Sequence, residues 1–384
     1  YMNGRMRLIG EDWVSLPSRP DAPARDMVVA SPGVEQPLLF AAGDFDRIFT
    51  PSGQVPVNGF AAFDGEAWFV PGGGFIGYAT SLAVGADEVV YVGAMVEAPV
   101  DEERPAVFAW DGAALTELPG LDASGSVDDL VVYDSGGGAA LYAIGRDLLG
   151  ASDFVRWNGA SWESAIAGQT SPRRNGAIVA EEKGDVLYMS SAFSPWIIRF
   201  DGALYESIPI RTAVGEYCRV KGIAAFDDGS GERLFICGDC DTDFHVRTPF
   251  VARLDGTSLS FLTSGADFDF YYGSDVNPID NVETLFAFTN GEFGAPTLLV
   301  GGDFSAVGGL AANAIAAWRA AYPLPGDVDG DNVVGMSDLM RILDAFNAGS
   351  GAPGSGPDAD LDNDLDVDFA DLNVVVSAFH SSCD

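Results

Sequence analysis

A short signature recurs five times in the first 256 residues and restricts what this chain can fold into. In each copy an apolar or aromatic residue is followed by Asp-Gly or Asn-Gly, as in Phe63-Asp64-Gly65 and Trp157-Asn158-Gly159. The copies end at Gly65, Gly112, Gly159, Gly202 and Gly256. Asp-Gly and Asn-Gly steps favour the tight turn of a β-hairpin, and β-prone residues flank each step. The chain therefore repeats an antiparallel hairpin.

Each hairpin belongs to a longer unit of four predicted strands. Apolar second strands precede the hairpins at residues 38–45, 90–94, 141–145, 187–191, 234–239 and 298–304, and the first and last of them end in Gly-Asp-Phe. Fourth strands follow the turns, as at residues 66–70 and 160–164. Four short strands repeated about every 36 to 55 residues are typical of a β-propeller.

Counting the units predicts six blades in residues 1–322. The sixth unit stops after its third strand, at residues 314–318, and residues 11–16 resemble a missing fourth strand. We therefore expect the strands around Trp13 and Trp318 to pair and close the ring. Seven blades are the alternative if residues 265–280 contain strands or the chain is truncated. The Gly-Asp-Phe and aromatic-Asp-Gly elements resemble those of kelch-like secreted propellers.

Two ladders of carboxylates lie near the C-terminus. Positions 1, 3, 5, 7 and 12 of a twelve-residue loop are Asp327, Asp329, Asp331, Val333 and Asp338 in the first ladder, and Asp360, Asp362, Asp364, Asp366 and Asp371 in the second. This spacing is that of a loop that folds hard oxygen ligands around one Ca²⁺, with a backbone carbonyl at position 7. We predict two calcium sites.

A helix is predicted to leave each loop. Its apolar residues are Leu339, Ile342, Leu343 and Phe346 in the first copy, and Leu372, Val375, Val376 and Phe379 in the second. The spacing i, i+3, i+4, i+7 places the four on one helix face. Val334 and Val367 occupy loop position 8. The C-terminal region is thus a duplicated loop-helix unit.

Residues 326–384 resemble a type I dockerin, and we place this domain at residues 323–384. The resemblance implies calcium-dependent docking to a cohesin-like protein through loop positions 10 and 11, here Met336-Ser337 and Phe369-Ala370. The two pairs differ, which argues against two equivalent binding modes. Loop position 6, usually Gly, is Asn332 or Leu365. Leucine tolerates the left-handed backbone poorly, so the second site is expected to be weaker.

The charge of the chain restricts its partners. It carries 57 acidic and 20 basic residues, a formal net charge of −37. Nucleic acid and anionic membranes are therefore not expected partners, because both need a basic surface. No apolar run reaches the length of a membrane span. Abundant carboxylate with Lys only at Lys183 and Lys221 suits a saline, calcium-rich exterior, although a base-composition bias in the genome would also favour Arg over Lys. We expect a secreted or cell-surface protein.

The segment 264–280 is the candidate ligand site of the propeller. It contains the aromatic and acidic residues Asp267, Phe268, Asp269, Phe270, Tyr271, Tyr272 and Asp275. Aromatic rings beside carboxylates suit a sugar or a cationic partner. A strand whose phenylalanines simply pack inward is the equally good alternative.

Four cysteines occur, Cys218, Cys237, Cys240 and Cys383. The turn near Asp228 would fold the strands on either side into a hairpin that places Cys218 opposite Cys240. We predict a disulfide between these two, over a Cys237-Cys240 redox pair. Cys237 and Cys383 are left buried, free or joined to each other.

Evidence for catalysis is thin. Only His245 and His380 are histidines, and no nucleophile or zinc-protease motif occurs.

The favoured function is a non-enzymatic propeller that presents a binding face and is docked or assembled through the calcium module. The alternatives are a carbohydrate-active propeller, hydrolase or lyase, carried by a dockerin, and a structural subunit of an extracellular assembly. Two carboxylates can hydrolyse a glycoside without histidine.

Overall fold

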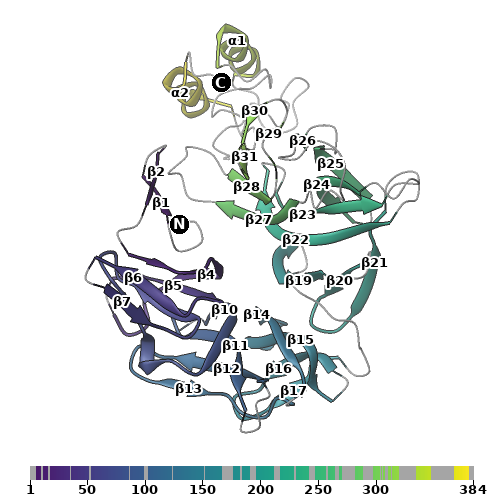
Figure 1. Cartoon of the computed structure of the whole chain (residues 1–384). Helices are drawn as coiled ribbons and strands as arrows, with labels where there is room; N and C mark the ends of the chain where they lie inside the picture. The colour runs from purple at the N-terminus through teal and green to yellow at the C-terminus, as the bar shows by residue number, and fades with distance from the viewer. Residues whose placement is uncertain are drawn as a thin grey trace. The chain divides into compact units, whose positions relative to one another are not determined.

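The structure is a computed structural model that contains mainly β-sheet (Figure 1). It describes residues 6–9, 12–15, 18–34, 36–51, 53–85, 87–98, 103–122, 124–150, 152–166, 176–181, 184–190, 196–211, 217–228, 231–241, 247–256, 258–263, 268–269, 282–288, 297–302, 304, 306–307, 310–312, 314–319, 334–346 and 367–379. The chain divides into two compact units. One comprises Tyr1–Ala225, Arg233–Phe286 and Val300–Ala316, and the other Phe226–Glu232, Ala287–Leu299 and Ala317–Asp384.

Five antiparallel sheets of four strands follow one another along the described chain. The first consists of β4 (Ala24–Ala30), β5 (Leu38–Gly43), β8 (Phe60–Phe63) and β9 (Trp68–Phe69), and the short 3-10 helix η1 (Pro71–Gly73) follows it. The second consists of β10 (Gly77–Val84), β11 (Val90–Glu97), β12 (Glu103–Trp110) and β13 (Leu115–Glu117). The third consists of β14 (Ser126–Asp134), β15 (Ala139–Leu149), β16 (Ser152–Trp157) and β17 (Trp162–Ser164). The fourth consists of β18 (Gly176–Glu181), β19 (Gly184–Ser190), β20 (Trp196–Phe200) and β21 (Tyr205–Pro209), and the fifth of β22 (Cys218–Asp227), β23 (Glu232–Asp241), β24 (Arg247–Asp255) and β25 (Ser258–Thr263).

The recurrent signature forms the hairpin between the third and fourth strands of these sheets. Phe63 pairs with Trp68 in the first sheet, and Trp157 pairs with Trp162 in the third, in the same register. Asn158 Oδ1 accepts hydrogen bonds from the backbone N–H groups of Ala160 and Ser161, at 3.0 and 2.9 Å. Asp64, Asp111 and Asp201 make the same pair of bonds, and the glycine after each has a positive φ of 89° to 99°. The turn is thus specified by two adjacent residue types.

Apolar clusters fill the spaces between consecutive sheets. Examples, in sheet order, are Phe40 with Leu82, Val107 with Leu141, Phe154 with Leu187, and Ile197 with Phe250. These side chains come from the two neighbouring sheets in each case and are buried. Side chains of a strand alternate between its two faces, so each middle sheet packs against the sheet before it and the sheet after it.

Buried carboxyl groups also join neighbouring sheets. Asp26 in β4 accepts a hydrogen bond from the N–H of Leu82 in β10, and Asp129 in β14 accepts one from Gly176 in β18, both at 2.7 Å. A register shift lies just before each aspartate. Burial, together with the nearby charge of Asp26, raises the pKa of Asp129 to about 8. These aspartates connect the first strands of successive sheets.

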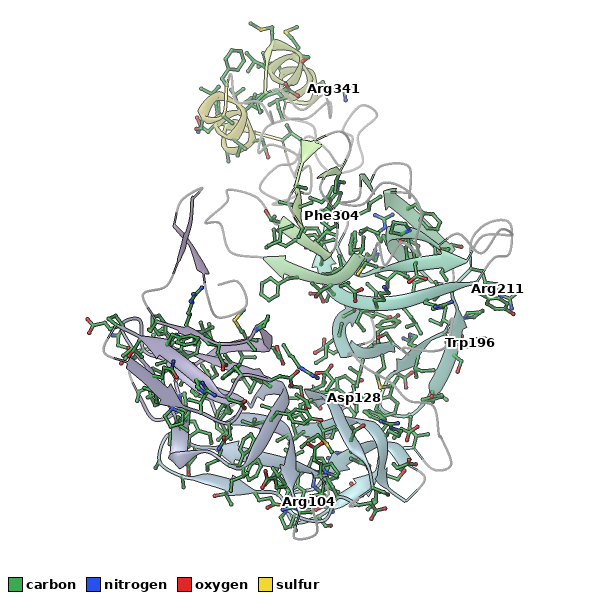
Figure 2. All side chains as sticks on the ribbon, viewed as in Figure 1. Arg104, Asp128, Trp196, Arg211, Phe304 and Arg341 are labelled. Carbon is green, nitrogen blue, oxygen red and sulfur yellow. A yellow bond between two sulfur atoms is a disulfide. The ribbon has the colours of Figure 1, made fainter. Side chains whose placement is uncertain are left out.

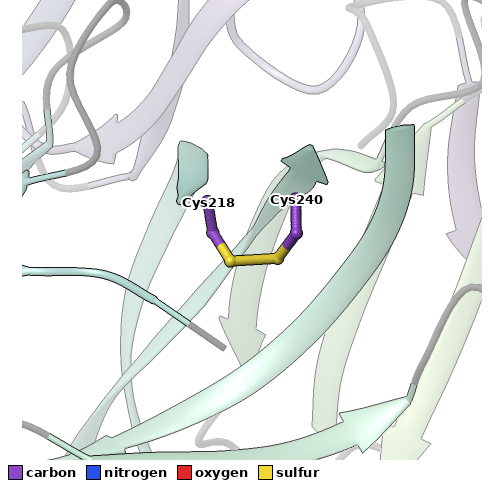
Figure 3. The surroundings of a disulfide bond; sticks show 2 residues. All are labelled: Cys218 and Cys240. Carbon is purple, nitrogen blue, oxygen red and sulfur yellow. A yellow bond between two sulfur atoms is a disulfide. The ribbon is translucent and has the colours of Figure 1, made fainter. Parts of the chain in front are cut away.

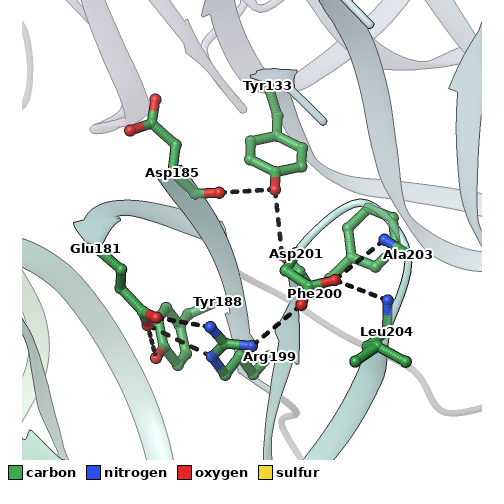
Figure 4. A network of polar contacts seen from close by, with 9 residues as sticks. All are labelled: Tyr133, Glu181, Asp185, Tyr188, Arg199, Phe200, Asp201, Ala203 and Leu204. Carbon is green, nitrogen blue, oxygen red and sulfur yellow. Dashed lines mark hydrogen bonds and ion pairs between the residues drawn. The ribbon is translucent and has the colours of Figure 1, made fainter. Parts of the chain in front are cut away.

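A polar network anchors the fourth sheet (Figure 4). Glu181 accepts hydrogen bonds from Tyr188 and from Arg199, both at 2.6 Å, so it joins β18, β19 and β20. Burial and the bond to Glu181 raise the pKa of Tyr188 to about 12. Tyr133 in β14 donates to the carbonyl oxygen of Asp185 at 2.9 Å. The network joins three strands of the fourth sheet to one another and this sheet to β14.

Two small sheets extend the strands that end in Gly-Asp-Phe. One is β3 (Arg19–Pro20), β6 (Arg47–Thr50) and β7 (Gly53–Pro56), and the other is β26 (Phe268–Asp269), β29 (Ala306–Val307) and β30 (Leu310–Ala311). Phe45 and Phe304, which end the two motifs, are fully buried. Gly59 and Ala314 lie at equivalent places, and both have a φ of 72°. The two inserts are therefore built alike.

The sixth sheet has three strands in the described chain, β27 (Val282–Phe288), β28 (Thr297–Gly302) and β31 (Ile315–Arg319). The N-terminal strands β1 (Met6–Ile9) and β2 (Asp12–Ser15) pair with each other. The predicted pairing of β2 with β31 is absent from the described strands. Leu8 of β1 pairs with Trp13 of β2 in the register of the other signature hairpins, so the described pairing of β2 uses one of its two edges.

A disulfide joins Cys218 in β22 to Cys240 in β23 (Figure 3). The Cα atoms of the two residues are 3.9 Å apart. This is the pair that the hairpin register predicts. Cys237 is a buried free thiol, and burial raises its pKa far above the usual range. Cys383 lies outside the described residues.

Two helices are described near the C-terminus, α1 (Met336–Ala345) and α2 (Phe369–Ser377). The sequence predicts one helix leaving each carboxylate loop, and the two helices are found there, each beginning at loop position 10, at Met336 and Phe369. No helix among the described residues is both long and apolar enough to cross a membrane.

Candidate functional site

Helices α1 and α2 share a small apolar core. Val334 before α1 and Val367 before α2 are buried with Ile342 and Val375. Leu339 and Leu372 pack against the cluster and are partly buried. Every residue of one half has its equivalent 33 positions later in the other half. The sequence repeat is therefore also a repeat in three dimensions.

Asp338 and Asp371, the predicted ligands at loop position 12, are both fully buried. Asp338 Oδ2 accepts a hydrogen bond from the backbone N–H of Gly335 at 2.7 Å, and Asp371 Oδ2 accepts one from Asp368 at 2.8 Å. Gly335 has φ −133° and ψ −161°, and Asp368 has φ −134° and ψ −155°. The two carboxylates are thus held in the first turn of their helices by the same local geometry.

A buried carboxylate is costly unless hydrogen-bond donors or a cation compensate its charge. The helix N-terminus contributes through its N–H groups and its dipole. Oxygen ligands of this kind suit Ca²⁺ rather than a transition metal. Asp338 and Asp371 are therefore suited to bind Ca²⁺ from the first turn of a helix, where each would connect its loop to that helix.

The other predicted calcium ligands lie outside the described residues. They are Asp327, Asp329, Asp331, Val333, Asp360, Asp362, Asp364 and Asp366. Within the described ranges no three His, Cys, Asp or Glu side chains gather as a metal-binding group. The two calcium sites stay a prediction.

The predicted docking positions are exposed. Met336 is 62% and Phe369 is 69% exposed, and Ser337 and Ala370 beside them are also at the surface. Phe369 makes an edge-to-face contact with Phe346, with ring centroids 5.0 Å apart. The side of the module away from its core thus presents apolar groups to solvent.

Three further exposed apolar residues were not predicted as contact positions. Met340 and Leu343 continue the line from Met336 along α1, and Val376 lies on α2. Leu343 and Val376 were expected on the buried face and are 47% and 55% exposed. Two helices alone cover only a narrow stripe of each other, so residues at its margin face water. The position of Met340, four residues after Met336 on a predicted helix, is a signal by which the sequence could have identified it.

The exposed faces of the two helices differ. On α1 the residues Met336, Met340 and Leu343 form an unbroken apolar stripe, with Arg341 also exposed on this helix (Figure 2). The equivalent of Met340 on α2 is Asn373, which is exposed between Phe369 and Val376. Despite the internal repeat, the two halves offer different surfaces to a partner.

The candidate ligand segment is described only in part. Phe268 and Asp269 form strand β26, which pairs with β29, so this piece is sheet rather than an open loop. Asp267, Phe270, Tyr271, Tyr272 and Asp275 lie outside the described residues.

No protein-family model matches the chain, and no curated protein matches it. Among solved structures, the extracellular domain of a candidate one-component system from B. thetaiotaomicron has 10% identity and a TM-score of 0.45 over 83% of this chain. The chain spans only 40% of that domain. A candidate glucose dehydrogenase from Thermus thermophilus has 10% identity and a TM-score of 0.39 over 72% of this chain and 90% of its own. A chain of the mitotic checkpoint complex has 16% identity and a TM-score of 0.40 over 66% of this chain and 64% of its own. Likeness at this level does not identify a function.

Proposed function

We propose that this is a secreted or cell-surface protein whose C-terminal module binds two Ca²⁺ and docks onto a cohesin-like partner. Its sheets form a six-bladed propeller that presents a binding face. The module covers residues 323–384 and is of the dockerin type. The supporting observation is the matched pair of buried carboxylates, Asp338 and Asp371, at the start of two equivalent helices whose outer faces are apolar.

Calcium would couple folding of the module to docking. The crowded loop carboxylates repel one another, and a bound Ca²⁺ supplies the positive charge that offsets this repulsion. Asp338 and Asp371 then connect each loop to its helix through their bonds to Gly335 and Asp368. The seam between Ile342 and Val375 is too small to hold such a charged module by burial alone.

The propeller would provide the second binding surface. Five consecutive four-stranded sheets with apolar cores between neighbours support this architecture. The ring would close when β31 pairs with the other edge of β2, with β1 as an added outer strand. Connections between the second and third strands differ most in length, and such variation on a constant scaffold builds binding faces.

Scanning calorimetry of the full chain in Ca²⁺ and in excess EDTA tests the calcium module. We expect two unfolding transitions, of which chelation removes one or moves it to lower temperature. If Ca²⁺ is at about a hundred times its Kd, each site that chelation empties lowers the stability of the module by about 3 kcal/mol. Asp338→Ala should weaken calcium binding at one site by more than about tenfold in isothermal titration. Asp358→Ala is the matched control, because Asp358 lies before the predicted loop and should leave both sites intact. A trace that EDTA leaves unchanged would refute the calcium assignment.

Binding to a panel of purified cohesin domains, with and without EDTA, tests docking. We expect at least one domain to bind only with calcium, and Met336→Asp to weaken this binding. If no domain of the panel binds in the presence of calcium, the proposed dockerin-type partner is refuted. The proposed calcium sites are not affected by this result.

A further inference from the structure

Two methionines project from the outer face of α1. Met336 is 62% and Met340 is 51% exposed, whereas Met95 and Met189 in the sheets are 8% and 0% exposed. Residues four apart on a helix are neighbours on its surface, so the two thioethers lie on one face. Among the methionines whose exposure the structure describes, Met336 and Met340 are the most exposed.

The described cysteine sulfur atoms are protected. Cys218 and Cys240 are joined in a disulfide, and Cys237 is buried. Its raised pKa disfavours the thiolate, the form that reacts with peroxides. An oxidant that reaches the protein therefore meets the thioethers of α1 before it meets a reactive cysteine of the described ranges.

The methionines of α1 do not support the core of the module. That core consists of Ile342 and Val334 with their equivalents from α2, on the inner side of the helix. Changing the outer side chains should leave the helix pair folded. It would, however, change the surface that a partner meets.

We propose that Met336 and Met340 form an oxidation site that controls docking. A hydroperoxide transfers one oxygen atom to the thioether sulfur, the O–O bond breaks, the sulfoxide forms and water or an alcohol leaves. The sulfur loses two electrons and the peroxide gains them. Each sulfoxide adds a polar acceptor to the apolar stripe of Met336, Met340 and Leu343. Burying that acceptor without a donor is unfavourable, so oxidation weakens the complex.

The site belongs to one half of the module. On α2 the equivalent positions hold Phe369 and Asn373, which contain no sulfur. Oxidation therefore acts on the α1 face alone. The effect on docking rests on the proposed function, whereas the reactivity of the two thioethers does not.

Peptide mapping by mass spectrometry tests the reactivity. The full chain is kept in Ca²⁺ and treated with limiting hydrogen peroxide, and the gain of one oxygen is followed at each methionine. We expect Met336 and Met340 to react roughly tenfold faster than Met95 and Met189, without a change in the circular dichroism spectrum. Equal or slower reaction at the α1 pair overturns the site.

The docking effect is measured with a cohesin domain that binds the untreated protein. The quantity is the ratio of the Kd after peroxide to the Kd before it. We expect a ratio of about ten for wild type and near one for the variant Met336→Leu with Met340→Leu, since leucine keeps the apolar bulk and cannot be oxidised. Treating the oxidised wild type with methionine sulfoxide reductases A and B together should return its Kd to the value before peroxide.

The outcomes separate the two ideas. A wild-type ratio near one, with both sulfoxides present, overturns the control of docking. If no cohesin domain binds the untreated protein, the dockerin-type function fails, and the oxidation site is then judged by the reaction rates alone.

Discussion

The carboxyl groups of individual aspartates lie in different surroundings in this chain, and their hydrogen bonds and pKa values differ accordingly. Asp64 and Asp201 lie at exposed turns, and hydrogen bonds from backbone N–H groups hold the pKa of each below its usual value. Asp129 lies between sheets, and burial with the charge of Asp26 raises its pKa to about 8. Asp338 and Asp371 are buried at helix starts, where donors point at them. For Asp64, Asp201 and Asp129, position in the fold decides whether the pKa lies below or above its usual value.

Asp129 makes stability depend on pH. Its carboxyl group holds its proton up to about pH 8 when folded but only up to about pH 4 when unfolded, so unfolding releases a proton between these values. The free energy of unfolding should therefore fall as the pH rises through this window. Asp26→Asn removes a charge that raises the pKa of Asp129, and should make this fall smaller.

Urea unfolding at a series of pH values from about 4 to about 9 measures the effect. Glu206→Gln is the control, because it removes one acidic group from the exposed side of β21. If Asp26→Asn and Glu206→Gln give the same dependence on pH, the interaction between Asp26 and Asp129 does not contribute.

At the scale of elements, hairpins are specified locally and are then joined by a few long-range contacts. The turn at Asn158-Gly159 uses only neighbouring residues. The hairpin of β22 and β23 is also joined covalently near its open end, through Cys218 and Cys240. Cys237 of β23 lies against Gly222 of β22, where a Cβ atom would come within 2.8 Å of the sulfur, so the two strands are also closely packed at this point.

Removing the disulfide should destabilise the fifth sheet. The bridge closes a loop with a sequence separation of 22 residues, for which the loss of loop-closure constraint costs about 3 kcal/mol. We expect the variant Cys218→Ala with Cys240→Ala to unfold at lower urea concentration than wild type. In reductant, the urea concentration at which wild type unfolds should fall toward that of the variant. The urea concentration at which the variant unfolds should not change with reductant. Recovery of a Cys237-Cys240 peptide from oxidised protein would contradict the assignment.

At the scale of the whole molecule, one unit consists of sheets that share cores with their neighbours, and the other contains the helix pair with its own core. Shared cores make consecutive sheets depend on one another for burial of their faces. The helix pair depends on its short seam and on the proposed calcium sites. The two kinds of packing should respond differently to heat and chelation.

Closure of the proposed ring depends on the N-terminal hairpin. If β2 completes the sheet of β31, deleting residues 1–17 exposes a strand edge. We expect the melting temperature to fall by several degrees, which corresponds to a loss of about 1 kcal/mol or more in the free energy of unfolding. Deleting residues 1–5, which precede β1, is the control. A melting temperature that is the same in both deletions would refute closure through β2.

The sequence by itself determined the elements whose information is local. Asp-Gly and Asn-Gly steps predict the hairpins because the turn needs one side-chain acceptor and one residue with positive φ. The same holds for the presence of α1 and α2, which the apolar spacing that begins at Leu339 and Leu372 predicts. Hairpin register likewise predicted the Cys218-Cys240 bridge.

Only the tertiary structure decided which surfaces meet. Leu343 and Val376 have the spacing of core residues, yet they face water, because two helices cover only a narrow stripe of each other. Strand β2 has a fourth-strand sequence, and its described partner is β1, because pairing with a strand nearby in the chain costs less chain entropy than pairing with a distant one. The raised pKa of Asp129 depends on Asp26, which is remote in sequence and near only in the fold. Periodicity records which side of an element is apolar, whereas burial depends on how many neighbours the fold brings to that side.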